Sequence, residues 1–234
     1  MSDQPSVSIN KYIAASGACS RRQADRLLDE GRVTLNGEPA RRGNRVAPGD
    51  EVLLDGKPLD DRPTAVYLAL HKPAGITCTT DRRDPTNIID YLDYPERIFP
   101  IGRLDKASTG LLLLTNDGDI VNRILRVENA HEKEYIVTVN RPINRTFVQR
   151  MAGGLPILGR TTKRCEVERL GPKKFRIVLT QGLNRQIRRM CEYLGYEVKT
   201  LKRIRIMNVR LGKQPVGELR ELRPDELEVL LALL

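Results

Sequence analysis

The feature that most constrains the fold is a run of four consecutive leucines at residues 111–114. A strand with one face in solvent alternates apolar and polar residues, whereas a continuous apolar run is typical of a strand buried on both faces. A polar loop at 101–110 precedes the run, and Asp117-Gly118 follows it as a turn signal. The sequence therefore predicts a sheet covered on both sides, with a polar loop entering its most buried strand.

Apolar periodicities on either side of this run predict an α+β domain over residues 65–234. Strands are expected at 66–70 and 135–139, a hairpin at 167–179 with Gly171-Pro172 in its turn, and extended chain at 198–209. Helices are expected at 118–125 (with Ile120, Val121, Ile124 and Leu125 on one side), at 184–195 with Asn184 as N-cap, and at 224–234 with Pro224 at the start.

Residues 6–56 predict a separate, small module. Helical spacing of apolar residues begins at Ile9 and ends at Gly17, and Ser20 with Gln23 forms a capping box that opens a second helix. Asn36-Gly37 is a strong hairpin turn signal. Residues 57–64 are polar and contain prolines, so we expect them to link the two domains.

The positive charge is concentrated in one segment. The chain has 40 Lys and Arg against 30 Asp and Glu, a net charge of +10. Residues 160–210 hold 15 basic and four acidic residues, which leaves 25 basic and 26 acidic residues elsewhere. Such a segment favours a nucleic-acid phosphate backbone as partner, because Lys and Arg release its counterions. The alternative is a basic face that is only solvated.

Several classes of protein are excluded or disfavoured. No apolar run approaches the ~20 residues that span a bilayer. Residues 1–5 lack the basic and apolar regions of a secretory signal, and the four cysteines suggest no disulfide framework, so we expect a cytoplasmic protein. Without a C-x-x-C pair, a Walker A motif or G-x-G-x-x-G, we expect neither a metal nor a nucleotide cofactor. DNA binding is disfavoured because no recognition-helix pattern is visible.

Two sites could carry chemistry. Asp105 lies in the polar loop before the leucine run, where its carboxylate could be catalytic or could simply cap its own turn. Arg185, Arg188 and Arg189 lie near the start of the helix expected at 184–195 and oppose its dipole. We expect a phosphate or a buried carboxylate to compensate them, unless they form an exposed basic face.

Three motifs then give a family resemblance. They are Gly102-Arg103-Leu104-Asp105 followed by residues 110–118, His-Glu-Lys-Glu-Tyr at 131–135, and residues 182–190. In this order the chain resembles bacterial ribosomal RNA pseudouridine synthases, and among them the F type of the large-subunit enzymes. Residues 6–56 resemble the S-four-like RNA-binding domain. The resemblance implies a mixed, largely antiparallel central sheet flanked by helices.

The resemblance also implies a reaction. Uracil moves from a nitrogen-linked to a carbon-linked glycoside within RNA, without a cofactor, after the base leaves its stack. Asp105 is implied as the essential carboxylate, attacking the sugar or removing its 2′ proton, with Arg188 as its partner. Tyr135 is implied to stack on the base and to assist proton removal from carbon 5. The implied partner is ribosomal RNA, a hairpin of 23S RNA first, with small-subunit and transfer RNA left open, bound by a monomer.

The implied RNA contacts come from both domains. They are Lys11, Arg21, Arg22 and Arg32 in the first, and Arg103, Lys133, Asn184, Arg185, Gln186 and Arg189 in the second. The competing hypothesis is a non-catalytic RNA-binding or ribosome-assembly protein that keeps this fold. Retention of Asp105, Tyr135 and Arg188 together argues against it.

Overall fold

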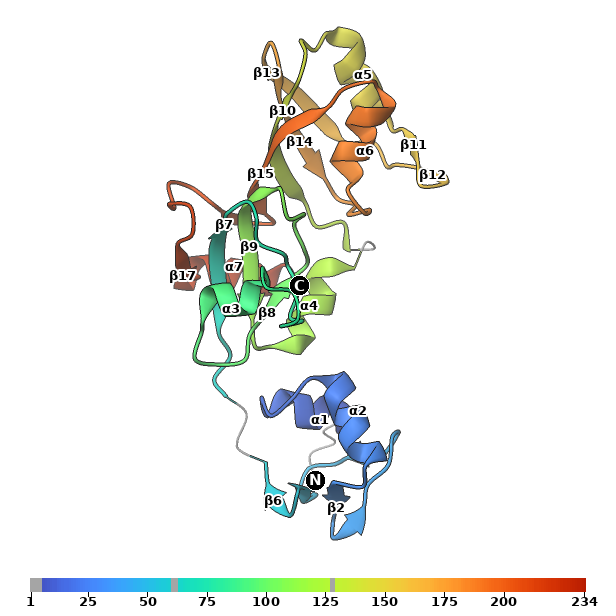
Figure 1. The fold of residues 1–234 in the computed structure, drawn as a ribbon, viewed down its shortest axis with the longest axis vertical. Coiled ribbons are helices and arrows are strands. Elements are labelled where there is room, and N and C mark those ends of the chain that lie inside the picture. The colour runs from blue at the N-terminus through green and yellow to red at the C-terminus, as the bar shows by residue number, and fades with distance from the viewer. Residues whose placement is uncertain (1–5, 60–62, 127–128) are drawn as a thin grey trace. The chain divides into compact units, whose positions relative to one another are not determined.

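The computed structural model describes residues 6–59, 63–126 and 129–234, which divide into two compact units (Figure 1). The first is built mainly from the N-terminal residues up to Ala65, and the second holds most of the remaining chain. Within the described ranges, no helix has the length and apolar character needed to cross a bilayer.

In its described residues, the first unit contains two helices and short strands around one apolar core. Its elements are β1 (Val7–Ser8), α1 (Ile9–Ala15), α2 (Arg21–Asp29), β2 (Val33–Leu35), β3 (Glu38–Pro39), β4 (Arg45–Val46), β5 (Val52–Leu54) and β6 (Lys57–Pro58). The predicted capping box opens α2, because Ser20 accepts from the Gln23 backbone and the Gln23 side chain accepts from the Ser20 backbone. The predicted hairpin turn has positive φ at both Asn36 (52°) and Gly37 (84°).

The sheet of this unit extends past residue 56. Its strand order is β3-β2-β5-β6, and β6 pairs with Leu53 and Leu54 of β5 through a turn at Asp55-Gly56. Asp-Gly favours such a two-residue turn because both positions take positive φ, here 52° and 75°. The prediction of a linker over 57–64 is therefore wrong for its first two residues, and 60–62 lie outside the described residues.

The second unit is an α+β domain around one large sheet. Its elements are β7 (Tyr67–Lys72), α3 (Ile88–Leu92), β8 (Phe99–Ile101), β9 (Thr109–Thr115), α4 (Gly118–Leu125), β10 (Lys133–Val139), α5 (Arg145–Gly153), β11 (Pro156–Ile157), β12 (Arg160–Thr161), β13 (Glu166–Gly171), β14 (Lys174–Leu179), α6 (Gln186–Tyr193), β15 (Val198–Ile206), β16 (Val209–Arg210), β17 (Leu219–Glu221) and α7 (Pro224–Ala232). The sheet order is β13-β14-β10-β15-β9-β7-β17, with β16 on β15 and β8 on β9. Among the described strands only β15 and β9 pair in parallel, so the predicted mixed, largely antiparallel sheet is confirmed.

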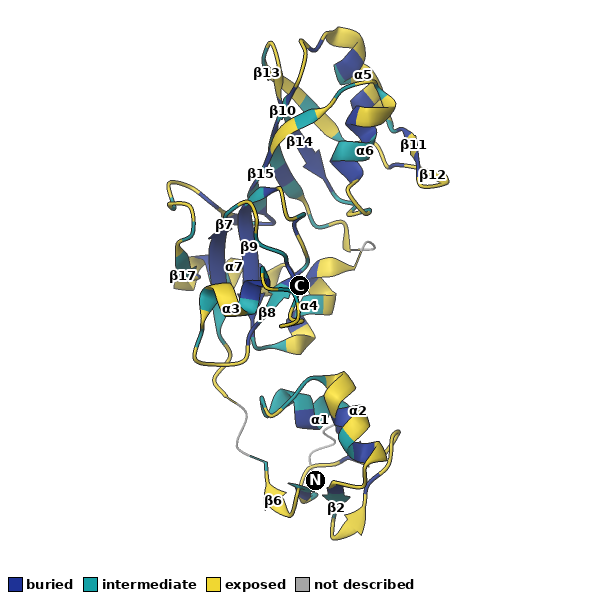
Figure 2. Ribbon diagram, in the orientation of Figure 1, coloured by how far each residue is buried: buried dark blue, intermediate teal, exposed yellow. Residues whose placement is uncertain are grey.

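The leucine run is buried on both faces of this sheet, as predicted. All four side chains are at most 1% exposed, and the whole of β9 from Gly110 onward is buried (Figure 2). Leu111 and Leu113 pack in one core cluster with α4 and α7, whereas Leu112 and Leu114 pack in another that includes Ile88 of α3. A strand that supplies two cores needs apolar side chains at every position, which explains the uninterrupted run.

A third core supports the other half of the sheet. It joins β10 and β14 to α5 and α6, with Phe147, Phe175 and Met190 fully or nearly fully buried. Helix α5 was not predicted; its N-cap is Asn144, whose side chain accepts from the Phe147 backbone at 2.9 Å.

One local prediction in this domain was wrong. Asn184 does not cap α6: the helix begins at Gln186, and its N-cap is Arg185 in the left-handed region at φ 50°. The Gln186 side chain accepts from the Leu183 backbone, so the chain turns once more before the helix starts. On α4, Ile120 and Ile124 are buried, whereas Leu125 at the end of the helix is 36% exposed.

Candidate active site

The fold brings the three predicted catalytic side chains to one cavity of about 610 Å³. Asp105 comes from the loop between β8 and β9, Tyr135 from β10 and Arg188 from the first turn of α6. The cavity is also lined by further cations, namely Arg103, Lys106, Lys133, Arg185 and Arg203. A carboxylate in this setting faces positive charge on several sides.

Asp105 sits in a tight turn, but its carboxylate points to arginines. Its backbone carbonyl accepts from Ser108 N at 2.9 Å, which closes the turn. The side chain is 29% exposed, and Oδ2 lies 3.3 Å from Arg188 Nε and 4.0 Å from Arg185 Nη1. The carboxylate does not cap the turn: the backbone carbonyl closes the turn, and the side chain pairs with the two arginines.

Arg188 holds two points of this loop. Its Nε donates to Asp105, and its Nη2 donates to the hydroxyl of Ser108 at 3.0 Å. The guanidinium is 11% exposed and Ser108 is 1% exposed. The carboxylate compensates a cation that would otherwise oppose the dipole at the start of α6.

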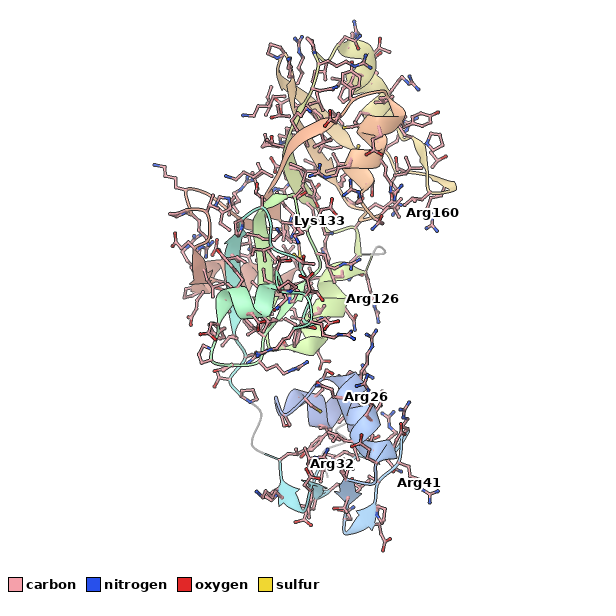
Figure 3. All side chains as sticks on the ribbon, in the orientation of Figure 1. Arg26, Arg32, Arg41, Arg126, Lys133 and Arg160 are labelled. Atoms are coloured by element: carbon pink, nitrogen blue, oxygen red, sulfur yellow. The ribbon has the colours of Figure 1, made fainter. Side chains whose placement is uncertain are left out.

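Tyr135 and Lys133 face the cavity from the same side of β10. Residues two apart on a strand share a face, and both line the cavity. Tyr135 is half-buried against apolar residues of two core clusters. Burial lowers the pKa of the Lys133 ammonium, and the nearby Arg203 cation lowers that pKa further. Lys133 is labelled in Figure 3.

The opposite face of β10 is fixed by a buried carboxylate. Glu134 is 5% exposed and accepts from Arg176 Nε and from Arg205 Nε, each at 2.6 Å. Burial raises the pKa of Glu134, but the hydrogen bonds from Arg205 and Arg176 outweigh it, so the pKa is lower than usual. This cluster ties β10 to β14 and β15 behind Tyr135.

Two buried cations that sequence reasoning missed hold the backbone around Asp105. Lys72, at the end of β7, is fully buried and donates to the carbonyls of Pro73 (2.7 Å) and Lys106 (3.4 Å). Arg203 of β15 is 3% exposed and donates to Leu111 O at 2.7 Å and to Arg103 O at 3.5 Å. Burial lowers the pKa of Lys72, against the opposing effects of Cys78 and Asp105.

A sequence signal for these two cations exists. Arg203 occupies the inward position after Leu201 on β15, and Lys72 ends a strand whose preceding residues are buried. A charged residue at a core position is rare unless it is paired.

Some of the residues predicted to contact RNA line the cavity, and others are bound to neighbouring residues. Arg103, Lys133, Asn184 and Arg185 line the cavity. Gln186 also lines it but is 4% exposed and engaged with Leu183. Arg189 turns back onto Asn184, donating to its backbone and side-chain oxygens at 3.1 and 3.2 Å.

In the first unit, the predicted RNA contacts lie on the helices and just before the sheet. Arg21 and Arg22 are exposed in the first turn of α2, and Lys11 lies on α1. Arg32 is exposed and forms ion pairs with Asp55 at 2.6 Å and Glu30 at 3.4 Å. No group of three His, Cys, Asp or Glu residues able to hold a metal occurs within residues 6–59, 63–126 and 129–234.

Comparison with known proteins finds relatives that match most of the chain. The RNA pseudouridylate synthase family matches residues 66–193, and the S4 domain matches residues 7–61. The chain is 55% identical to the dual-specificity RNA pseudouridine synthase RluF of Escherichia coli (strain K12), over 95% of this chain and 77% of that protein. The chain belongs to the RNA pseudouridine synthase family. The family predicted from the three motifs is thereby confirmed.

More distant members of the family match almost the whole length of the chain. The ribosomal large subunit pseudouridine synthase B of Bacillus subtilis (strain 168) is 34% identical, over 96% of each chain. A crystal structure of a pseudouridylate synthase superposes with a TM-score of 0.71 at 31% identity, covering 96% of this chain and 99% of the other. This RNA pseudouridine synthase is thus an enzyme, and the non-catalytic alternative is not supported.

Proposed function

We propose that this synthase isomerises uridine in ribosomal RNA, at a hairpin of the 23S RNA. Support comes from the relatives, one named for the ribosomal large subunit and one for dual specificity. The basic residues around the cavity suit a folded polyanion. The second specificity in the relative's name makes a further RNA class, transfer RNA first, a substrate to assay alongside it.

The observation that carries the proposal is the meeting of Asp105, Tyr135 and Arg188 in one cavity. The reaction breaks the bond between N1 of uracil and C1′ of the ribose, and forms a bond between carbon 5 and C1′. Carbon 5 loses its hydrogen as a proton, and N1 ends protonated. Atoms and electrons balance without a redox partner.

Asp105 acts on the sugar. A carboxylate can attack an anomeric carbon or accept a proton beside it, and glycosidases use the same group at such a centre. Both routes need an ionised carboxylate held still. Arg188 places a positive charge beside the carboxylate of Asp105. Its second hydrogen bond, to Ser108, fixes the orientation of the loop that carries Asp105.

Tyr135 acts on the base. Its half-buried ring offers a flat surface for an extruded uracil, and its hydroxyl can assist removal of the proton from carbon 5. Extrusion costs a few kcal/mol, which contacts to flanking phosphates offset. Arg103, Lys133, Asn184 and Arg185 line the cavity where those phosphates would pass. Gln186 and Arg189 hold the turn that carries Asn184 and Arg185, through hydrogen bonds to Leu183 and Asn184.

The first unit adds RNA affinity outside the cavity. Lys11, Arg21, Arg22 and Arg32 are its candidate phosphate contacts, on an S4 domain that ends no earlier than β6. The proposed form of the enzyme that acts on RNA is a monomer. Its place of action is the cytoplasm, where bacterial ribosomes are assembled.

Asp105→Asn tests the proposal. The measurement is tritium release from a 23S RNA transcript labelled at carbon 5 of uridine, with RNA affinity measured by filter binding. We expect the Kd of the variant for RNA to stay within about twofold of wild type. Its kcat should fall by at least ~10³-fold, because an amide can neither attack the sugar nor accept its proton. Near-normal turnover would refute the role of Asp105.

Asp93→Asn is the matched control. Asp93 ends α3 in the left-handed region at φ 43°, where Asn is readily accommodated, and it does not line the cavity. It should release tritium at the wild-type rate. Absence of release by the wild-type protein from ribosomal RNA, with release from transfer RNA, would move the proposed substrate to the second class.

A further inference from the structure

The hairpin of β11 and β12 has an unusual residue, a leucine, at the first position of its turn. Its two turn residues are Leu158 and Gly159, with φ 51° and 72°, a combination that Asn-Gly normally provides. A leucine in the left-handed region is strained, and at this tip it gains no burial in exchange, since it is 48% exposed. A strained residue with no structural compensation is expected where function requires it.

The hairpin is built rigidly below its tip. Thr162 N donates to Leu155 O, and Leu155 N donates to the Thr162 hydroxyl, both at 3.0 Å, in a pair that is almost fully buried. Ile157 packs in the core cluster of α5 and α6. At Gly154 (φ 95°) a Cβ would come within 2.5 Å of Thr162 O, so the base of the hairpin is closely packed. Leu158 is therefore presented on a fixed support.

The hairpin is joined to the rim of the catalytic cavity. The backbone N–H of Lys163, just beyond β12, donates to the side chain of Gln181 at 3.1 Å, and Gln181 lines the cavity. The four residues from Lys163 back to Gly159 span at most about 13 Å of extended chain. The tip thus lies within reach of RNA that flanks a nucleotide bound in the cavity.

The charge around the tip fits RNA. Residues 154–165 contain no acidic residue, and Arg160, Lys163 and Arg164 are all exposed. The ion pairs found in the described part of the chain include none to these three side chains. Arg160 extends from the hairpin into solvent (Figure 3). An apolar tip flanked by unpaired cations suits a base and its neighbouring phosphates.

We propose that the β11–β12 hairpin is an RNA-contacting element in which Leu158 packs against an unstacked base beside the target uridine, while Arg160 binds an adjacent phosphate. This deepens the proposed function, on which it rests. Extrusion of the target opens the stack of its neighbours, and the exposed face of a neighbouring base is the apolar surface that Leu158 would cover.

Leu158→Asn separates recognition from folding. Asn is favoured at this φ, so the variant should unfold at the same temperature as wild type or higher. Its Kd and KM for a 23S RNA transcript labelled with tritium at carbon 5 of uridine should rise roughly tenfold, with kcat within about twofold. Arg160→Ser should weaken binding and reduce the slope of log K against log salt by about 1.

Leu233→Asn is the matched control, since Leu233 is 53% exposed at the end of α7 and does not line the cavity. It should bind RNA like wild type. Equal Kd values for wild type, Leu158→Asn and Arg160→Ser would overturn the proposal, as would an equal loss in Leu233→Asn. A wild-type protein that binds this RNA without releasing tritium would refute the proposed function, whereas the ratio of Kd values would still decide the role of the hairpin.

Discussion

Arg188 and Asp105 are 83 residues apart in the sequence, yet Arg188 Nε lies 3.3 Å from Asp105 Oδ2. The same guanidinium reaches Ser108, so one side chain orients both the carboxylate and the turn that carries it. Geometry of this kind needs the planar fork of arginine, because an ammonium group is a single point of charge.

Arg188→Lys should therefore lower kcat while changing RNA affinity little. A lysine keeps the charge but cannot bond Asp105 and Ser108 together, and a hydrogen bond to a charged group contributes about 1.5 to 3 kcal/mol. We expect turnover to fall by roughly tenfold to a hundredfold in the tritium-release assay. The control is Arg145→Lys, because Arg145 is exposed at the start of α5 and does not line the cavity. A variant of Arg188 as active as that control would contradict the positioning role.

The sequence indicated Asp105, Tyr135 and Arg188 through motifs, but it could not show that they meet. Their meeting depends on the order of strands, in which β10 and β9 lie on either side of β15. Lys72 and Arg203 were missed for the same reason: a cation becomes buried only when distant strands pack around it. Asn184 was misassigned because Gln186 satisfies the Leu183 backbone and delays the start of the helix.

Lys72→Met tests the buried ammonium beside the Asp105 loop. Loss of its bond to Lys106 O should shift the loop, and small displacements of reacting groups cost up to about a hundredfold in rate. We expect kcat to fall while KM stays within about threefold. The measurement is tritium release at saturating and subsaturating RNA. Unchanged kcat would show that the loop holds its shape without Lys72.

The same variant has an expected pH signature. Burial lowers the pKa of Lys72 below its ordinary value of 10.5, so the unfolded chain binds more protons between the two values. Wild-type stability should therefore gain with rising pH in that window, relative to Lys72→Met. Urea unfolding at several pH values up to 10.5 measures the difference in stability between the two proteins. The pKa of Lys133 is also lowered, but Lys133 is present in both proteins and its contribution cancels. Parallel curves for the two proteins would contradict this linkage.

Glu134→Gln tests the charge cluster behind Tyr135. Removing the charge leaves the partly buried Arg176 and Arg205 with exposed glutamate partners only, and we expect a loss of about 2 to 3 kcal/mol at pH 7. The pKa of Glu134 is lowered in the folded state. Its stabilisation is therefore complete above the ordinary value of 4.5 and is lost as pH falls through the folded pKa.

The stability gap between wild type and Glu134→Gln should thus be constant above about pH 5 and shrink in acid. Urea unfolding between about pH 3 and pH 7 measures it. Glu168→Gln is the control, because its carboxylate is 58% exposed and lies 3.5 Å from Arg176. That variant should stay within about 0.5 kcal/mol of wild type. A gap that persists undiminished below the folded pKa would contradict the assignment.

The fold was predictable where sequence patterns were strong and local. The leucine run, the capping box at Ser20 and the Asn36-Gly37 hairpin each needed only neighbouring residues. Helices α3 and α5 were missed; α3 has five residues, and the nine of α5 bury only Phe147 and Met151. Their stability comes from packing on the sheet, which a single sequence does not display.

Gly110→Ala tests the close approach that joins the two halves of the sheet. Gly110 pairs with Arg203 across the parallel β9–β15 ladder, and it has φ 109°. An added Cβ would lie 2.2 Å from Arg203 O and 2.6 Å from Arg203 N, so β15 would have to move away. Steric overlap and backbone strain together should cost about 3 kcal/mol. Because Arg203 holds the carbonyl of Arg103, activity should fall as well, even where the variant is folded.

Gly153→Ala provides the matched control for this substitution. Gly153 ends α5, and a Cβ built there meets nothing within 4 Å. Alanine is favoured over glycine in a helix, so this variant should gain about 0.5 to 1 kcal/mol. Urea unfolding of both variants, with tritium release measured at a temperature where each is folded, decides the point. Equal stability of the two variants would mean that β9 and β15 tolerate a wider spacing, and the catalytic loop would then not depend on Gly110.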